Sequence, residues 1–360
     1  MKLSQRDWLK LKMKGRKLSQ VQEAAHTAIP EETLPRTGCA SWFVRAGRLR
    51  SGWRVLLYGI AARLVDLISA FVIGVVLAVT VGAALARQGL PPSEIPSRIV
   101  GMLENFVQNP ALALGGEGER LVAVLVLVWL FRRIVDRKSF RSLGFELTSG
   151  WWQEALGGFA FVIASWAVIF LLSLGLGGAI VVGSVADSGN WVGIAGGLAF
   201  GLVLNVMVGV TEETDARGYI LQNLAEGIRL WPAVFVSALY FGLLHLLNPG
   251  AGLGSTAGIF VAGVLLALGY YATRRLWFPI GMHVAWNFAE GPLFGFLVSG
   301  LNMGGLVQLK ITGPDWLMGG AFGPEAGALA VGVEIAMIIV LYVWGRGRQR
   351  SREALNSIDK

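Results

Sequence analysis

Long stretches of almost purely apolar residues recur along this chain, and they constrain its fold more than any other feature. A helix needs roughly 20 mostly apolar residues to cross the hydrocarbon core of a bilayer. Stretches of this kind lie at about 64–86, 154–180, 192–211, 256–272, 277–300 and 325–344, with shorter ones at about 119–135 and 231–247. The first of the shorter stretches is flanked by Glu117, Glu119 and Arg120, which indicates a tilted or partly interfacial helix. The sequence therefore predicts an all-α integral membrane protein, a bundle of about eight transmembrane helices.

Composition supports this fold class and argues against an ordinary soluble protein. Apolar residues make up 54% of the 360 residues and charged residues 15%, whereas about 25% charged residues is usual in soluble domains. The 13 tryptophans suit a membrane protein, because aromatic rings anchor helix ends at the two interfaces. The formal charge of +8 is concentrated near the N-terminus and in loops beside apolar stretches. We therefore expect a lipid bilayer around the chain and no nucleic-acid partner.

The positive charges also predict the orientation of the chain, because Lys and Arg accumulate in cytoplasmic loops. Beyond the basic N-terminal segment, basic residues follow every second apolar stretch: Arg132, Arg133, Arg137, Lys138 and Arg141; Arg217 and Arg229; Arg274 and Arg275; Arg346, Arg348 and Arg350. The loops between them are poor in positive charge, since 181–191 and 248–255 have none and 301–324 has only Lys310. This alternation places both termini in the cytoplasm.

The same features divide the chain into three parts. Residues 1–53 form a basic cytoplasmic N-terminal extension without the apolar core of a signal peptide. This extension is either an amphipathic segment on anionic lipid or a basic tail without fixed structure. Residues 54–345 form a polytopic membrane domain, and residues 346–360 form a basic cytoplasmic tail. The segment 87–118 is the longest external stretch and is either a loop or a short interfacial helix.

A run of charged residues lies at the end of the apolar stretch 192–211. Ionisable groups within membrane helices are costly and indicate a functional site. Glu213 and Arg217 are an i,i+4 pair with the acid on the N-terminal side, which is the favourable order. Glu212 lies about 100° further around the helix and is not the natural partner of that Arg. We therefore infer that Glu213 pairs with Arg217 and leaves Glu212 free to act.

Two of the three histidines of the chain also fall in apolar stretches. These are His245 and His283, and Asn287 follows His283 by one helical turn. A general base needs a pKa near the working pH, which a His or a desolvated Glu supplies, and an Asn amide offers donors to a developing oxyanion. With Glu212, these groups meet the needs of water-mediated amide cleavage. The single Cys39 leaves no zinc-ligand spacing.

Three short motifs occur in a fixed order on these stretches. They are Glu212-Glu213-x-x-x-Arg217, Phe241-x-x-x-His245 and His283-x-x-x-Asn287, accompanied by Gly218-Tyr219-Ile220-Leu221-Gln222 and Ser142-Leu143-Gly144-Phe145. In this order they resemble the CPBP family of intramembrane glutamate proteases. That family includes the CAAX prenyl endopeptidases and the bacterial Abi-type proteins linked to bacteriocin processing and immunity. The resemblance covers roughly 140–290 and marks about 140–300 as a protease-like core.

The resemblance implies a hydrolase, a glutamate endopeptidase that cuts a membrane-associated peptide or protein without a metal ion or other cofactor. The residues it carries over are Glu212, as general base, and His245 for water activation, His283 and Asn287 for the oxyanion site, and Glu213 and Arg217 as supporting groups. The Abi-like character suggests a prokaryotic cytoplasmic membrane.

Two other functions fit the same residues less well. A non-catalytic membrane scaffold or bacteriocin-immunity protein could share the fold, but the complete set of Glu, His and Asn favours an enzyme. A secondary transporter could use the acids and histidines as a proton relay. Such a protein is expected to have interrupted helices in both halves, whereas these residues are concentrated in the second half.

The chain also departs from the family pattern. Family members usually carry bulky apolar residues between the Glu pair and the Arg, whereas this chain has Thr214-Asp215-Ala216. Asp215 either influences the ionisation of Glu212 by like-charge proximity or faces water at the cytoplasmic end of its helix, and we favour the second.

The depth of the two histidines raises a further question. His245 lies about 21 Å beyond Trp231 along its helix, whereas His283 lies only about 9 Å beyond Trp277. If both helices begin at the same interface, the two imidazoles cannot meet. The helix that carries His245 must therefore begin outside the hydrocarbon layer or tilt strongly.

Overall fold

The structure is a computed structural model that describes residues 40–45, 48–104 and 109–358. Internal contacts divide the chain into two units, residues 1–47 and residues 48–360. The described part of the first unit holds a four-residue helix α2 (Ala40–Phe43) and a two-residue strand β1 (Val44–Arg45). Most of the predicted N-terminal extension 1–53 lies outside the described residues. Among the described residues, the second unit contains every long helix.

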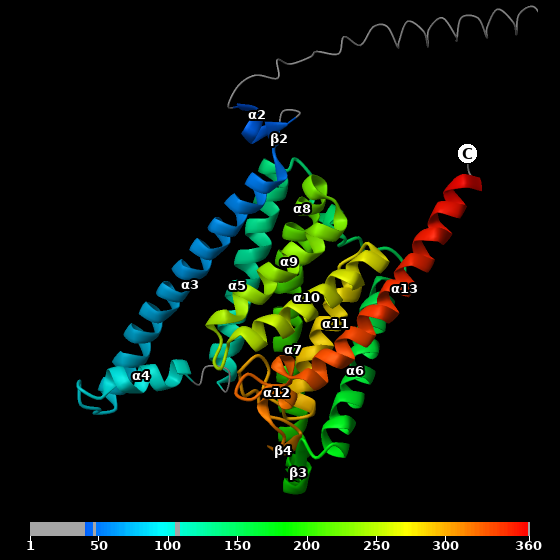
Figure 1. The fold of residues 1–360 in the computed structure, drawn as a ribbon. Coiled ribbons are helices and arrows are strands. Elements are labelled where there is room, and N and C mark those ends of the chain that lie inside the picture. Colours follow the sequence, from blue (N-terminus) through cyan, green and yellow to red (C-terminus); the bar gives the residue numbers. More distant parts are fainter. Residues whose placement is uncertain (1–39, 46–47, 105–108, 359–360) are drawn as a thin grey trace, which may run out of the picture. The chain divides into compact units, whose positions relative to one another are not determined.

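Helices dominate the second unit (Figure 1). They are α3 (Ser51–Arg87), α4 (Ile95–Glu104), α5 (Pro110–Leu130), α6 (Trp151–Gly175), α7 (Trp191–Glu213), α8 (Leu221–Ile228), α9 (Leu230–Leu244), α10 (Leu253–Thr273), α11 (Trp277–Phe288), α12 (Asp315–Met318) and α13 (Ala328–Ile358). Short π-helical and 3₁₀ turns join them: η2 (Phe131–Val135), η3 (Phe140–Leu143), η4 (Val185–Ser188), η5 (Thr214–Ile220), η6 (His245–Leu247), η7 (Ala289–Leu293) and η8 (Pro324–Ala326). The strands are β2 (Arg48–Leu49), β3 (Ala179–Ser184) and β4 (Val307–Ile311).

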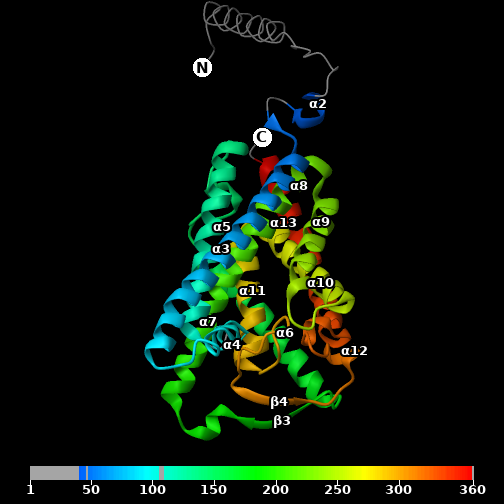
Figure 2. The ribbon, with the colours of Figure 1, turned by 90° about the vertical axis from the view of Figure 1, so that its left-hand side faces the viewer.

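Strands β3 and β4 pair antiparallel, with Ala179 opposite Ile311 and an irregularity between Val181 and Gly183. This ribbon and α12 lie at one end of the second unit, and the first turn of α3, α8 and the last turns of α13 lie at the other (Figures 1 and 2). The predicted cytoplasmic tail 346–360 continues α13 as far as Ile358. Which end faces the cytoplasm stays a prediction.

Six helices of the described chain are long and apolar enough to cross a membrane, so the all-α membrane fold is confirmed. They are Ser51–Arg87, Trp151–Gly175, Trp191–Ile228, Leu230–Leu247, Leu253–Thr273 and Ala328–Ser351. The predicted count of about eight is not confirmed. The other two predicted stretches correspond to α5, which carries three charged residues, and α11, which has only 12 residues.

The predicted helix 277–300 is too long. Helix α11 ends at Phe288, and a π-helical turn with Pro292 follows it. Proline has no N–H to continue the helical hydrogen bonds, and Gly295 takes a left-handed backbone with φ of 78° that reverses the chain.

The predicted external stretch 87–118 divides into two helices. The short helix α4 occupies its middle, but α5 begins earlier than expected, at Pro110. The side chain of Asn109 caps this start, because its oxygen accepts hydrogen bonds from the N–H groups of Ala111 and Leu112. Helix α5 carries two of its charged residues, Glu117 and Arg120, to the wall of the cavity described below.

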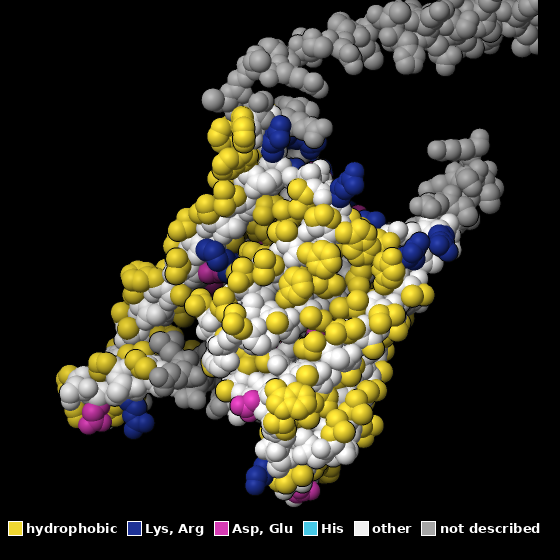
Figure 3. Space-filling view, in the orientation of Figure 1, with side chains coloured by type: hydrophobic (Ala, Val, Ile, Leu, Met, Phe, Trp, Pro, Cys, Tyr) yellow, Lys and Arg dark blue, Asp and Glu magenta, His cyan; other side chains and the backbone are white. Residues whose placement is uncertain are grey.

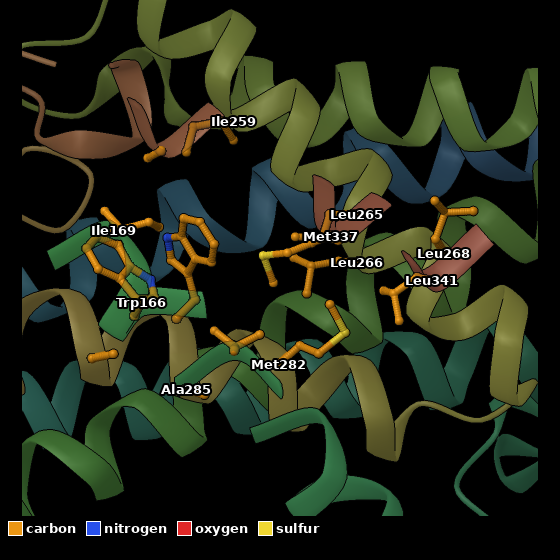
Figure 4. Close-up of a cluster of buried hydrophobic side chains, with 14 of the residues drawn as sticks. Trp166, Ile169, Ile259, Leu265, Leu266, Leu268, Met282, Ala285, Met337 and Leu341 are labelled. Atoms are coloured by element: carbon orange, nitrogen blue, oxygen red, sulfur yellow. The ribbon is translucent and has the colours of Figure 1, made fainter. Parts of the chain in front are cut away.

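Helix α11 lies at the centre of the fold, where it packs against α6 and α7, while α10 packs against α9 and α13. Every residue from Phe278 to Trp286 is buried. Glycine lets α6 and α11 approach closely, because a Cβ atom on Gly281 would lie 1.9 Å from the carbonyl oxygen of Ala155. A buried apolar cluster fills the space between these helices; among its members are Trp166, Ile169, Leu265, Leu266, Met282 and Met337 (Figure 4).

The outer faces of the bundle are apolar as well. Hydrophobic side chains are spread over the face shown in Figure 3, and most of its Lys and Arg side chains lie toward the two ends. The most apolar part of α3 has no buried residue. Surfaces of this kind are expected to contact lipid.

Candidate active site

Glu212 and Glu213 are the last two residues of α7, and the chain continues through the π-helical turn η5 into α8. Such π-helical insertions are frequent at functional sites. Glu213 is fully buried, and its Oε1 accepts a hydrogen bond of 2.7 Å from Nη1 of Arg217. The structure thus contains the predicted i,i+4 pair of Glu213 and Arg217, and Glu212 does not bond to this Arg.

Glu213 has a second partner that the sequence did not predict. Its Oε1 lies 2.8 Å from Nδ1 of His283, which α11 places opposite the end of α7. Because Arg217 holds Glu213 as a carboxylate that can only accept, the hydrogen in this bond belongs to Nδ1 of His283. Nε2 of His283 is then left facing Glu212.

His245 is the first residue after α9. Its Nδ1 lies 2.8 Å from the carbonyl oxygen of Phe241, one turn earlier. A carbonyl oxygen can only accept, so Nδ1 carries the hydrogen here too and Nε2 has a free lone pair in the neutral ring. The ring of Phe241 lies edge-on to both His245 and His283, and this aromatic contact fixes their relative position.

The two histidines converge on one oxygen atom. Oε2 of Glu212 lies 3.7 Å from Nε2 of His283 and 4.0 Å from Nε2 of His245. Helices α9 and α11 begin at different levels, and this explains how His245 and His283 meet although they lie at different distances from their helix starts. Leu276, just before α11, packs against Gly218 of η5, whereas α9 begins only after the chain has continued to Ile228. Ten further helical residues place the start of α9 about 15 Å beyond that of α11.

The turn between α10 and α11 is held in place by Gly144. Its φ of 109° is a left-handed conformation, and its carbonyl oxygen accepts a hydrogen bond of 3.1 Å from the N–H of Leu276. A Cβ atom at this position would lie 2.9 Å from the Cα atom of Arg275, so only glycine fits without displacement. This glycine belongs to the Ser142–Phe145 motif and fixes where α11 begins.

All four residues predicted to be catalytic line one cavity of about 300 Å³, at the small end of the range for ligand sites. Asn287 is half-buried at its wall, one turn beyond His283. The other charged or amide side chains of the wall are Arg63, Glu117, Arg120, Asn205, Asp215, Asn248 and Glu325. The wall also has apolar residues, among them Val162, Leu204, Ile259, Leu265, Leu266 and Met282.

Sequence reasoning did not select the residue that contacts Glu212 most closely. Nη1 of Arg120, on α5, lies 3.2 Å from Oε1 of Glu212 and 3.5 Å from Oε1 of Glu117. The signal was present, because charged residues interrupt the apolar stretch 119–135 and such residues indicate function. We interpreted them as a sign of a tilted or interfacial helix instead.

Glu325 is a second residue that the sequence did not single out. It is buried at the cavity wall and accepts hydrogen bonds from the N–H and hydroxyl of Ser299 and from Nε1 of Trp286. Burial raises the pKa of its carboxyl group, and the Ser299 hydrogen bonds oppose this increase. These three hydrogen bonds satisfy the carboxyl group and hold the loop 294–327 against α11.

The favoured expectation for Asp215 is wrong. Only 6% of its surface is exposed, so it is not on the water-exposed surface of the protein. Instead its Oδ2 accepts a hydrogen bond of 2.9 Å from the hydroxyl of Tyr240 on α9. Asp215 therefore ties the π-helical turn η5 to α9.

Residues 192–289 match the sequence model of a family described as type II CAAX prenyl endopeptidase, Rce1-like. The curated proteins and the solved structures contain no match to the chain. The matched segment begins at the start of α7 and ends just after α11, so it includes all six predicted site residues. The resemblance to the CPBP family is thereby confirmed, and over residues 192–289 this membrane protein is similar to the CAAX prenyl endopeptidases.

Proposed function

We propose that the protein is an intramembrane endopeptidase that hydrolyses a peptide bond of a membrane-associated substrate. The observation that carries this proposal is the position of one Glu212 oxygen 3.7 Å from Nε2 of His283 and 4.0 Å from Nε2 of His245, inside a cavity. Two atoms about 4 Å apart can both be about 2.8 Å from one water molecule. The arrangement therefore suits a water held between a carboxylate and an imidazole.

Glu212 and His245 activate this water. One water hydrogen points to Oε2 of Glu212 and the other to the free lone pair on Nε2 of His245. The water oxygen then directs its own lone pair at the carbonyl carbon of the substrate. As the C–O bond forms, Glu212 takes a proton from the water as general base. The same proton passes to the amide nitrogen when the C–N bond breaks, which releases a carboxylic acid and an amine.

His283 and Asn287 stabilise the oxyanion that forms on the carbonyl oxygen. Because Nδ1 of His283 donates to Glu213, Nε2 can donate only when the ring is an imidazolium. The ionised Glu213 stabilises this cation and orients the ring, as a buried carboxylate does in serine proteases. Arg217 holds Glu213 in place and thereby acts on the site through it. The Asn287 amide supplies the second donor.

The chemistry of this mechanism uses no metal ion. Among the described residues, no group of three or more His, Cys, Asp or Glu side chains has positions suited to hold one. A chelator tests this part of the proposal directly, and loss of cleavage on chelation would contradict it.

The experiment compares protein termini in membranes of cells that carry the wild-type chain or Glu212→Gln, each with and without chelator. We expect a set of cleavage products that is absent in the variant and present with chelator. Glu94→Gln makes the same change at an exposed residue away from the cavity and should keep all products. The description of the matched family names a CAAX prenyl endopeptidase. A prenylated CAAX peptide and its unprenylated form are therefore the first purified substrates to compare.

The alternative is a non-catalytic scaffold or bacteriocin-immunity protein with the same fold. It predicts identical termini in cells with the wild-type chain and with Glu212→Gln, although both proteins are folded in the membrane. That outcome would refute the endopeptidase.

A further inference from the structure

Arg120 contacts the active carboxylate from outside the segment that matches the family. It lies 92 positions before Glu212, on a different helix, yet its Nη1 is 3.2 Å from Oε1 of Glu212. The matched segment begins at residue 192. This contact is therefore a property of the fold of this chain and is not contained in the family motifs.

The contact divides the two oxygens of Glu212 between two tasks. Oε1 points to the guanidinium of Arg120, and Oε2 points to the two histidine rings. A carboxylate can rotate about its last side-chain bond, so an unheld Glu212 would share its orientations between productive and unproductive ones. A guanidinium bound to one oxygen selects the orientation in which the other oxygen faces the water position.

Arg120 is itself well placed for this task. Helix α5 packs directly on α7, and Gly118 allows the close approach, since a Cβ atom there would lie 3.1 Å from the side chain of Met207. Glu117, one turn earlier on α5, lies 3.5 Å from Nη1 and steadies the guanidinium. The same cation also separates two carboxylates, Glu117 and Glu212, that would otherwise face each other across the α5–α7 interface.

We propose that Arg120 is a positioning residue of the active site, which holds Oε1 of Glu212 so that Oε2 faces His245 and His283. The proposal rests on the proposed endopeptidase function. It assigns a catalytic need to α5, a helix that sequence reasoning treated as a tilted or partly interfacial span. Arg120 acts through Glu212, so its loss should slow the chemical step and leave substrate binding nearly unchanged.

The test uses the full chain in detergent or proteoliposomes and a peptide whose cleavage depends on Glu212. We expect Arg120→Gln to lower kcat by about tenfold to a hundredfold, as misplaced catalytic groups do, with KM changed less than about twofold. Added guanidinium at millimolar concentration should restore part of the kcat of Arg120→Ala, whereas the same concentration of urea should not. Arg133→Gln is the matched control, because Arg133 follows α5 in η2 and is exposed.

Three outcomes would overturn the proposal without refuting the endopeptidase. The first is an unchanged kcat in Arg120→Gln while Glu212→Gln is inactive, and the second is a rise in the KM of Arg120→Gln at constant kcat. The third is a loss of kcat that only follows a loss of thermal stability and is not rescued by guanidinium. If neither Arg120→Gln nor Arg120→Ala accumulates in the membrane, Arg120→Lys decides. A kcat at least threefold lower at unchanged KM and thermal midpoint supports positioning by the guanidinium fork, and a wild-type kcat refutes it. An active Glu212→Gln would instead refute the proposed function itself.

Discussion

Two clusters of buried charge in this bundle differ in how completely their carboxylates are bonded. Asp136, just after α5 and η2, is fully buried, and its carboxylate accepts four hydrogen bonds: from Arg54 (3.0 Å), Arg132 (3.2 Å), Asn223 (3.3 Å) and Tyr219 (3.4 Å). Glu212 has one such partner, Arg120, and two imidazole nitrogens beyond hydrogen-bond distance. It also lines a cavity, which none of the five residues of the Asp136 cluster does.

From this difference in bonding we infer that the Asp136 cluster stabilises the fold, whereas Glu212 takes part in the reaction. A buried charge costs free energy unless its partners replace the water it has lost, and four donors replace that water around the Asp136 carboxylate. It joins α3, α5 and the η5–α8 segment, because Arg54, Arg132, Tyr219 and Asn223 come from these elements and their extensions. Glu212 is left with an oxygen that only water or substrate can satisfy. We therefore expect changes in one cluster to affect folding and changes in the other to affect turnover.

The largest effect is expected for Glu212→Gln. Glutamine keeps the shape of the side chain but cannot take a proton from water, so turnover should fall by roughly a thousandfold or more. Thermal stability in detergent should change little, because Glu212 has few bonds to lose. Measured side by side, kcat and the unfolding midpoint check both halves of this expectation. A large fall in the midpoint would place Glu212 with Asp136 as a structural charge.

Asp136→Ala should show the opposite pattern. Arg54 keeps its 2.9 Å contact with Glu226, but Arg132 loses its buried carboxylate, and breaking such a pair costs about 3–5 kcal/mol. Unfolding by heat or denaturant in detergent measures the loss. Turnover per folded molecule should remain within about twofold of wild type. An inactive but stable Asp136→Ala would remove the contrast between the two clusters.

Glu213→Gln tests a residue that shares both properties. It is fully buried like Asp136, yet its Oε1 holds both Arg217 and His283. A neutral amide cannot stabilise an imidazolium, so His283 stops donating to the oxyanion. The kcat should then fall by about a hundredfold, as on loss of one oxyanion donor, which is less than for Glu212→Gln. Steady-state kinetics with folded protein checks this. The mechanism assigned to His283 fails if kcat is unaffected.

Sequence reasoning succeeded where partners lie on one helix or in one motif. Glu213 and Arg217 are four residues apart, so helix geometry alone predicts their contact. The grouping of Glu212, His245, His283 and Asn287 came from family motifs, and the structure places them around one cavity. Periodicity and hydropathy were enough for the membrane fold, because apolar length is read directly from the sequence.

The remaining features depend on tertiary structure. Arg120 reaches Glu212 and Arg54 reaches Asp136 across separations of 92 and 82 residues, which no local pattern encodes. The convergence of the two histidines required α8 to extend beyond the start of α11. A hydropathy profile cannot show this extension, because it does not show which helices begin at the same level.

The smallest effect is expected for Asp215, a buried acid with a structural partner beside the active site. Asp215→Leu restores an apolar residue of the kind the family usually carries, but it leaves the hydroxyl of Tyr240 without its 2.9 Å acceptor. We expect a loss of about 1–2 kcal/mol in stability and a kcat within about threefold of wild type.

Tyr240→Phe is the matched control and should cost a similar amount by leaving Asp215 unpaired. Because replacing both partners by apolar groups is nearly neutral, the double variant should be more stable than either single variant. A double variant in which the two losses simply add would show that this bond contributes nothing. A kcat that falls as far as in Glu213→Gln would place Asp215 with the cluster that acts in turnover.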